Sequence, residues 1–194
     1  MEAWAQYLDT VSAGLRNLVV TDKRGAVVEP EAAFQRWLEI TRELKVAAGG
    51  VYIVGNGASA AMASHVAADA CKNGELRAQA FTDPSLFTAI GNDLAFDQIF
   101  ALPLARFARS GDLLITISSS GRSPNVVRAL ECARSMSLRI VTLSGRDADN
   151  PSRGYGDLNF YIPHHRYGWV ECAHQVILHY WLDQFMNTYG HGAT

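Results

Sequence analysis

Short apolar runs that end at glycine or serine, and that precede helical patterns, constrain the fold of this chain most strongly. The clearest are VYIVG at 51–55, DLLITIS at 112–118 and LRIVTLSG at 138–145. Runs of this length and composition are typical of strands that are buried on both faces of a parallel sheet. An alanine-rich helical pattern follows the first run, and PNVVRALECARSM follows the second. This alternation of strand and helix favours a parallel sheet with helices on both faces.

Two further runs extend the sheet, because RAQAF at 77–81 and LNFYIP at 158–163 also have the composition of strands. We therefore expect an α/β fold with a five-stranded parallel sheet flanked by helices, in the three-layer, flavodoxin-like arrangement. Short helices are predicted over 84–91 and 96–108, and the last helix over 168–188.

A helical extension precedes this sheet. Apolar residues recur at helical spacing over 2–20 and 30–47, and the segment between them, TDKRGAVVEP, predicts a loop. We expect a single domain over 1–194, with the N-terminal helices in 1–48 and the α/β core and C-terminal helix in 49–194.

Composition excludes several classes of function. The chain has 194 residues and a net charge of −2, so it lacks the basic field of a nucleic-acid-binding protein. No apolar run reaches the roughly 20 residues that cross a membrane, and the first residues do not have the pattern of a signal peptide. Cys71, Cys132 and Cys172 show no paired spacing. We expect a cytoplasmic protein that binds a small molecule, not nucleic acid or membrane.

The central strand ends in ITISSSGRSPNVV, residues 115–127, where four hydroxyls precede a helix. In parallel sheets ligands bind beyond the carboxyl ends of the strands. Helix N-termini present free N–H groups that bind phosphate, and hydroxyls add neutral donors. Helix capping by Ser123 would explain one serine. It leaves Ser118, Ser119 and Ser120 unexplained, so the segment predicts a phosphate site.

A second strand end, Gly55-Asn56-Gly57-Ala58-Ser59, has a similar character. Its glycines allow close approach of an anion to the backbone, and Asn56 and Ser59 add hydrogen-bonding side chains. The spacing matches neither a Walker A loop nor a dinucleotide-binding fingerprint. A purely structural turn explains this loop equally well.

A pair of polar residues lies on the alanine-rich helix. His65 and Asp69 are four positions apart, so their side chains share one helix face. Together they could hold one zinc ion or contact one substrate. The alternative is a helix histidine of purely structural role beside a solvated carboxylate.

The last helix offers further candidate ligands. Glu171 and His179 lie about 80° apart around the helix, and His174 lies about 60° from Glu171 on the other side. Cys172 and His179 fall within about 20° of each other. Helical geometry therefore leaves a Cys/His pair open as an alternative metal site.

Four segments jointly resemble the sugar isomerase (SIS) domain family, and within it the phosphoheptose isomerases. They are VYIVGNGASAAMASHVAAD, FTAIGNDLAFDQIFALPL, GDLLITISSSGRSPNVVRALE and VECAHQVILHYWLDQ, in the family's order and over nearly the whole chain. The resemblance implies that a phosphosugar binds at Asn56, Gly57, Ala58, Asn92, Asp93, Ser118, Ser119, Ser120 and Ser123.

The resemblance also implies a zinc site. In phosphoheptose isomerases a histidine and a glutamate of the first helix, with a glutamine and a histidine of the last, hold the metal. The matching positions are His65, Asp69, Glu171 and His179, so two agree and two differ. By analogy Asp69 and His179 exchange protons with the sugar. Glu171 is the substitute base if the shorter Asp69 does not reach the substrate.

The implied reaction converts sedoheptulose 7-phosphate to D-glycero-D-manno-heptose 7-phosphate through an enediol, in a homotetramer with zinc as cofactor. We expect the serine hydroxyls and the His65–His179 region to share one cavity. Two alternatives remain open. One is a non-catalytic SIS protein that binds phosphosugars or associates with a replication initiator. The other is an isomerase of a different sugar phosphate.

Overall fold

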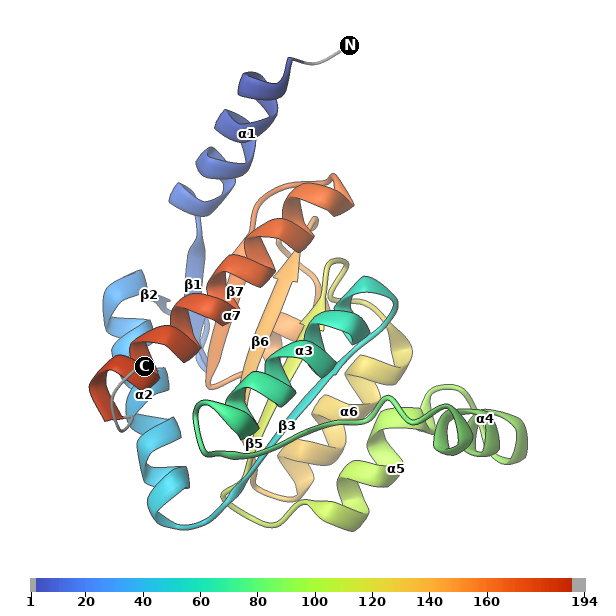
Figure 1. The fold of residues 1–194 in the computed structure, drawn as a ribbon. Helices are drawn as coiled ribbons and strands as arrows, with labels where there is room; N and C mark the ends of the chain where they lie inside the picture. The colour runs from blue at the N-terminus through green and yellow to red at the C-terminus, as the bar shows by residue number, and fades with distance from the viewer. Residues whose placement is uncertain (1–2, 190–194) are drawn as a thin grey trace.

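A seven-stranded sheet with helices on both faces forms the body of the protein in the computed structural model, which describes residues 3–189 (Figure 1). The strand order is β2-β1-β7-β6-β5-β3-β4. In chain order the elements are α1 (Trp4–Arg16), β1 (Val19–Asp22), β2 (Val27–Val28), α2 (Pro30–Val46), β3 (Gly50–Gly55), α3 (Ala58–Lys72), β4 (Arg77–Ala80), α4 (Pro84–Asp93), α5 (Gln98–Phe107), β5 (Leu113–Ser118), α6 (Pro124–Ser135), β6 (Arg139–Gly145), the short 3₁₀ helix η1 (Pro151–Gly154), β7 (Leu158–Ile162) and α7 (Tyr167–Tyr189).

The α/β fold class is confirmed, and the five predicted strands pair in parallel as β4-β3-β5-β6-β7. The loop predicted for TDKRGAVVEP is wrong in part. Val19–Asp22 pairs antiparallel with β7, and Val27–Val28 pairs antiparallel with β1. Asp22 Oδ1 accepts hydrogen bonds from the backbone N–H groups of Arg24 and Ala26, which closes the hairpin turn. The sheet therefore has two more strands than the five predicted.

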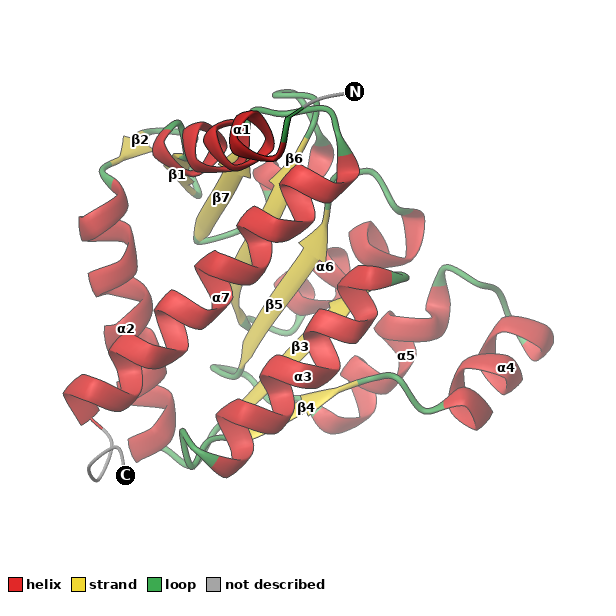
Figure 2. Ribbon diagram, turned by 45° about the horizontal axis from the view of Figure 1, so that its top comes forward, coloured by secondary structure: helices red, strands yellow, loops and turns green. Residues whose placement is uncertain are grey.

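Two hydrophobic clusters cover the two faces of the sheet. Figure 2 shows the helices that lie over the sheet. Helices α2, α3 and α7 pack on one face, and α4, α5 and α6 pack on the other. The alternate side chains Leu113, Ile115 and Ile117 of β5 face the first cluster, and Leu114 faces the second. Every residue of β5 is buried, which explains why its sequence, LLITIS, is mostly apolar and has no charged residue.

The N-terminal helix α1 projects from the body and has no buried residue (Figure 1). The helix is shorter than predicted because the chain turns into β1 three residues after Arg16. Residues 1, 2 and 190–194, which the single-domain prediction includes, lie outside the described residues. Within residues 3–189, no helix combines the length and apolarity that crossing a bilayer requires.

Candidate active site

A cavity of about 200 Å³ opens at the carboxyl edge of the sheet, between the ends of β3 and β5 and the first turns of α3 and α7. The structure thus brings together the four serines of the 118–123 segment and two residues of the 55–59 loop. Gly57 and Ala58 are exposed beside it. The residues that line the cavity are Asn56, Ser59, Ile117, Ser118, Ser119, Ser120, Ser123, Tyr167 and Glu171.

The serine segment curls at Gly121, whose φ of +61° is a conformation that favours glycine. The Gly121 N–H donates to Ser118 Oγ at 3.1 Å, and the Arg122 N–H donates to Ser120 Oγ at 3.2 Å. Ser123 occupies the N-cap position of α6, but its hydroxyl makes no capping bond. Capping therefore does not account for Ser123, whose hydroxyl accepts a hydrogen bond from Ser118 Oγ at 3.5 Å and lies in the cavity lining.

The loop after β3 is shaped for close backbone approach. A Cβ atom at position 55 would lie 2.6 Å from Ser59 Cβ and 2.8 Å from the Ile117 carbonyl oxygen, so only glycine fits. Gly57 has a φ of +56° and begins α3 without a side-chain cap. The N-termini of both α3 and α6 lie at this edge, and neither N-cap residue makes a side-chain capping bond, so the helix dipoles favour an anion there.

A reciprocal amide pair joins the two loops. Asn56 Nδ2 donates to Asn125 Oδ1 at 2.9 Å, and Asn125 Nδ2 donates to Asn56 Oδ1 at 2.8 Å. Asn125 is 1% exposed and also accepts a hydrogen bond from the Val126 N–H. The pair fixes the Asn56 side chain at the cavity wall.

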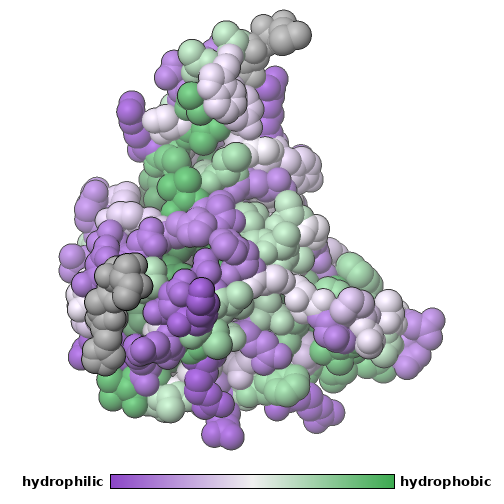
Figure 3. All heavy atoms as spheres, viewed as in Figure 1, coloured by the Kyte–Doolittle hydropathy of each residue, from purple (hydrophilic) through white to green (hydrophobic). Residues whose placement is uncertain are grey.

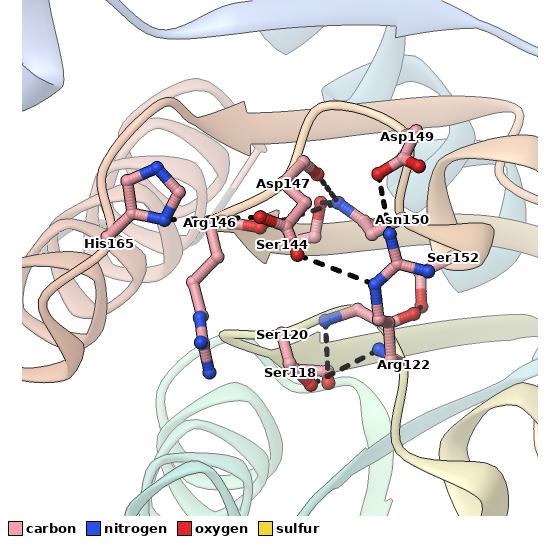
Figure 4. Close-up of polar contacts among 12 residues, drawn as sticks. Ser118, Ser120, Arg122, Ser144, Arg146, Asp147, Asp149, Asn150, Ser152 and His165 are labelled. Atoms are coloured by element: carbon pink, nitrogen blue, oxygen red, sulfur yellow. Dashed lines mark hydrogen bonds and ion pairs between the residues drawn. The ribbon is translucent and has the colours of Figure 1, made fainter.

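The loop after β6 holds the serine segment from behind (Figure 4). Both the N–H and the hydroxyl of Ser152 donate to the Gly121 carbonyl, at 3.2 and 2.8 Å. The buried Asn150 donates to Ser144 Oγ and packs so tightly on Gly121 that any Cβ there would overlap it. The conformation of residues 118–121 is therefore imposed by tertiary contacts.

Three of the four candidate zinc ligands form one group between α3 and α7. The ligand atoms of His65, Asp69 and His179 all lie within 4.8 Å of one another. His65 Nε2 lies 3.3 Å from Asp69 Oδ2, and the two imidazole ring centres are 5.4 Å apart. Two imidazole nitrogens, one carboxylate oxygen and an open side fit the donor set of a catalytic zinc site.

Glu171 lies apart from this group and lines the serine cavity instead. The angle of 80° between Glu171 and His179 ignores their eight-residue separation, which is about 12 Å along the helix axis. Cys172 is exposed and, among the described residues, does not join the group either. Within one chain, neither His65 nor His179 lines the serine cavity, so the expected shared cavity is absent from the described residues.

His174 is a core residue. It is 0% exposed, and its Nε2 lies 3.1 Å from the Ser144 carbonyl oxygen. Burial lowers the pKa of His174 to about 4, so its ring is neutral near pH 7. This histidine contacts the end of β6 and does not belong to the metal group.

Asn92 and Asp93 do not line the serine cavity of this chain. They end α4, which lies at the periphery, and Asn92 Nδ2 donates to Asp93 Oδ1 at 2.8 Å (Figure 1). Both side chains are exposed. Their predicted contact with a phosphosugar remains a prediction.

Sequence reasoning missed three residues of the site: Asn125, Asn150 and Tyr167. Asn125 follows Pro124 in the serine segment, where a polar residue on the buried face of a helix was a usable signal. Asn150 lies in the loop after β6 and packs behind Gly121, and Tyr167 begins α7 and lines the cavity; only the fold brings either residue to the site.

Comparison with known proteins identifies the family of this chain. Residues 7–145 match the family model described as SIS domain. The chain belongs to the SIS domain family. The match covers both cavity loops and His65 with Asp69, and it ends before α7, which carries Glu171 and His179.

Relatives of this SIS domain include phosphoheptose isomerases. That of Nitratidesulfovibrio vulgaris is 40% identical over 131 residues, which are 64% of this chain and 62% of the relative. That of Syntrophotalea carbinolica is 36% identical over 70% of this chain and 71% of its own length. Among solved structures, phosphoheptose isomerase from Neisseria gonorrhoeae superposes with a TM-score of 0.80 and 29% identity, covering 93% of this chain and 96% of that chain.

Proposed function

We propose that this SIS domain isomerises sedoheptulose 7-phosphate to D-glycero-D-manno-heptose 7-phosphate. Relatives named phosphoheptose isomerase, at 36–40% identity, support an aldose–ketose isomerase. The observation that carries the proposal is one cavity lined by four serine hydroxyls and the Glu171 carboxylate. A phosphate anchor and a nearby base are what the isomerisation of a sugar phosphate requires.

The serine segment binds the phosphate end of the sugar. Hydroxyls of Ser118, Ser119, Ser120 and Ser123 donate to its oxygens, and the positive dipole ends of α3 and α6 add to the attraction. Neutral donors in a fixed loop hold the ester at one end, so that the other end of the sugar is oriented toward the base.

Glu171 is the proposed base, because it is the carboxylate that lines the same cavity as the serines. It removes a proton from C1 of the ketose while the C2 carbonyl oxygen gains a proton, and an enediol forms between C1 and C2. Protonation of C2 and loss of the O1 proton complete the aldose. His179 is the proposed acid; since it does not line the serine cavity of its own chain, it would reach the sugar only in the assembled homotetramer proposed below. Each such group typically contributes about 10²–10⁴-fold in rate.

His65, Asp69 and His179 would hold a zinc ion, since their donor atoms gather within 4.8 Å. A bound zinc ion would supply Lewis-acid polarisation of the sugar carbonyl. Asp69 and His65 also contact each other at 3.3 Å, which orients both side chains before any ligand binds.

We propose a homotetramer, because a single chain leaves the metal group and the apolar side chains of α1 exposed. The His65 side chain is 54% exposed, and Trp4 and Leu8 of α1 are 72% and 47% exposed. Figure 3 shows apolar side chains along the arm that α1 forms. Sedimentation equilibrium should give four times the chain mass, and Trp4→Asp should lower the measured mass.

We propose a cytoplasmic location, since the three free cysteines agree with a reducing compartment.

The proposed function is tested with a panel of ketose phosphates and metal-loaded protein. We expect kcat/KM to be highest for sedoheptulose 7-phosphate. Higher kcat/KM for another ketose phosphate would assign a different substrate. Tight binding of a phosphosugar without turnover of any member would assign a non-catalytic SIS protein.

A further inference from the structure

The proposed phosphate site has a charge problem. Among the described residues, the lining of the serine cavity includes no lysine or arginine, and it does include the Glu171 carboxylate. A phosphate ester carries nearly two negative charges at pH 7. A cation beside the cavity is therefore needed to offset repulsion between the ester and Glu171.

Arg122 follows the serines in sequence, but its charge is used elsewhere (Figure 4). Its NH2 nitrogen lies 2.5 Å from Asp149 Oδ1, and its Nε lies 3.5 Å from Asp147 Oδ2. Both carboxylates belong to the loop after β6, so Arg122 ties the serine segment to that loop. Its guanidinium is neutralised by two acids.

Arg146 comes from the neighbouring strand end. Ser118 of β5 pairs with Ser144 of β6, so Ser120 and Arg146 both stand two residues beyond that pair at the same edge of the sheet. Arg146 NH1 donates to the Tyr167 hydroxyl at 3.0 Å, and Tyr167 lines the cavity. Among the described residues, no carboxylate lies within 4.0 Å of the Arg146 guanidinium nitrogens, and its Nε is buried without a hydrogen-bond partner.

The backbone of Arg146 has an unusual conformation for a residue that directly follows a strand. Its φ is +60°, whereas the other described non-glycine residues of positive φ, Ala48, Glu75 and Ser137, follow the C-terminal ends of helices, where such a conformation is common. Arg146 instead follows a strand. Its N–H donates to the His164 carbonyl and its carbonyl accepts from the Tyr161 hydroxyl, at 3.0 and 2.8 Å. Strained positions that tertiary bonds enforce occur preferentially at functional sites.

We propose that Arg146 is the cation that binds the phosphate of the substrate, held in place by Tyr167, and that Arg122 only positions the serine segment. The inference rests on the proposed function, since it assigns the charge partner of the same phosphosugar. It makes Arg146 a specificity-determining residue for phosphorylated over neutral sugars.

The test compares Arg146→Gln, Arg146→Lys, Arg122→Gln and wild type, with Arg128→Gln as a control for loss of a surface charge, since Arg128 pairs with Glu131 on α6. The readouts are KM and kcat for sedoheptulose 7-phosphate and the competitive Ki of inorganic phosphate. We expect Arg146→Gln to raise KM and Ki by roughly tenfold to a hundredfold with little change in kcat. Arg146→Lys should recover part of the loss, and Arg128→Gln should match wild type.

Several results would overturn the inference: an unchanged Ki in Arg146→Gln, or a larger rise in Ki in Arg122→Gln than in Arg146→Gln. If Arg146→Gln does not fold, as judged by circular dichroism, a wild-type Ki in Tyr167→Phe with a raised Ki in Arg122→Gln overturns it as well. Failure of the proposed function can be distinguished from failure of this inference. Phosphate binding that depends on Arg146, in a wild-type protein without turnover, would support this inference and reject the isomerase.

Discussion

Asn56 and Asn125 lie 69 positions apart in the chain and exchange two side-chain hydrogen bonds, of 2.9 and 2.8 Å. The pair couples the loop after β3 to the first turn of α6, the two segments that form opposite walls of the proposed phosphate site. A site assembled from two strand ends depends on this contact, because each loop alone has other conformations open to it.

Asn125→Ala should therefore affect both stability and binding. Loss of the buried partner leaves the Asn56 amide without its two bonds, and we expect the free energy of unfolding to fall by about 1–3 kcal/mol. KM for the phosphosugar should rise because Asn56 is no longer fixed. Urea denaturation and steady-state kinetics measure the two effects. Asn73→Ala, at an exposed position after α3, is the control; equal effects of both variants would contradict the role of the pair.

Glu171→Gln keeps the shape of the side chain and removes the base. We expect kcat to fall by about 10²–10⁴-fold, with little change in the circular dichroism spectrum. The double variant Asp69→Glu with Glu171→Gln has the ligand set that the family resemblance implies, and it should regain part of kcat. Wild-type kcat in Glu171→Gln would exclude Glu171 as the base.

Gly121→Ala should lower the free energy of unfolding by more than the positive φ of Gly121 alone would cause. The new Cβ would overlap Asn150, and the φ of +61° adds strain, so we expect a loss of about 2–4 kcal/mol. Gly111→Ala is the matched control, because its φ is +89° but no atom lies within 4 Å of the new Cβ. There we expect only about 1 kcal/mol. Thermal unfolding of both variants is the measurement, and equal losses would show that packing on Asn150 is unimportant.

His174 should make stability depend on pH. Its pKa is about 4 in the folded protein, below the ordinary value of 6.5, because burial disfavours the charged ring. Between these values the unfolded chain binds more protons, so stability is fully present above pH 6.5 and is lost as the pH falls toward 4. The contribution is roughly 3 kcal/mol. Urea denaturation from pH 4.5 to 7.5 gives the free energy of unfolding at each pH. That free energy should change less with pH in His174→Gln than in wild type, and an identical pH dependence would contradict this assignment.

The parallel core could be predicted because each central strand is buried on both faces, which makes it a continuous apolar run that ends at glycine or serine. The hairpin of β1 and β2 could not. Its strands have four and two residues, and Val19 and Val20 form strand only by pairing with Tyr161 and Phe160, far along the chain.

The candidate site was predictable to the extent that it lies within single loops or on one helix turn. Serines at a strand end and a four-residue helix spacing are local signals, and the structure brings their residues together. The separation of Glu171 from His179 was missed because an angle around a helix omits the rise along it. The partners of Arg122 and Asn56 come from other segments, so only the fold identifies them.

Nuclear magnetic resonance of sedoheptulose 7-phosphate in D₂O, with zinc-loaded wild type and His179→Ala, tests directly whether the protein isomerises this sugar phosphate and whether His179 is required. We expect wild type to form the heptose 7-phosphate with deuterium at C2, and His179→Ala to form none while it retains the wild-type melting temperature. Absence of conversion by wild type, or conversion by His179→Ala at a near wild-type rate, would contradict it.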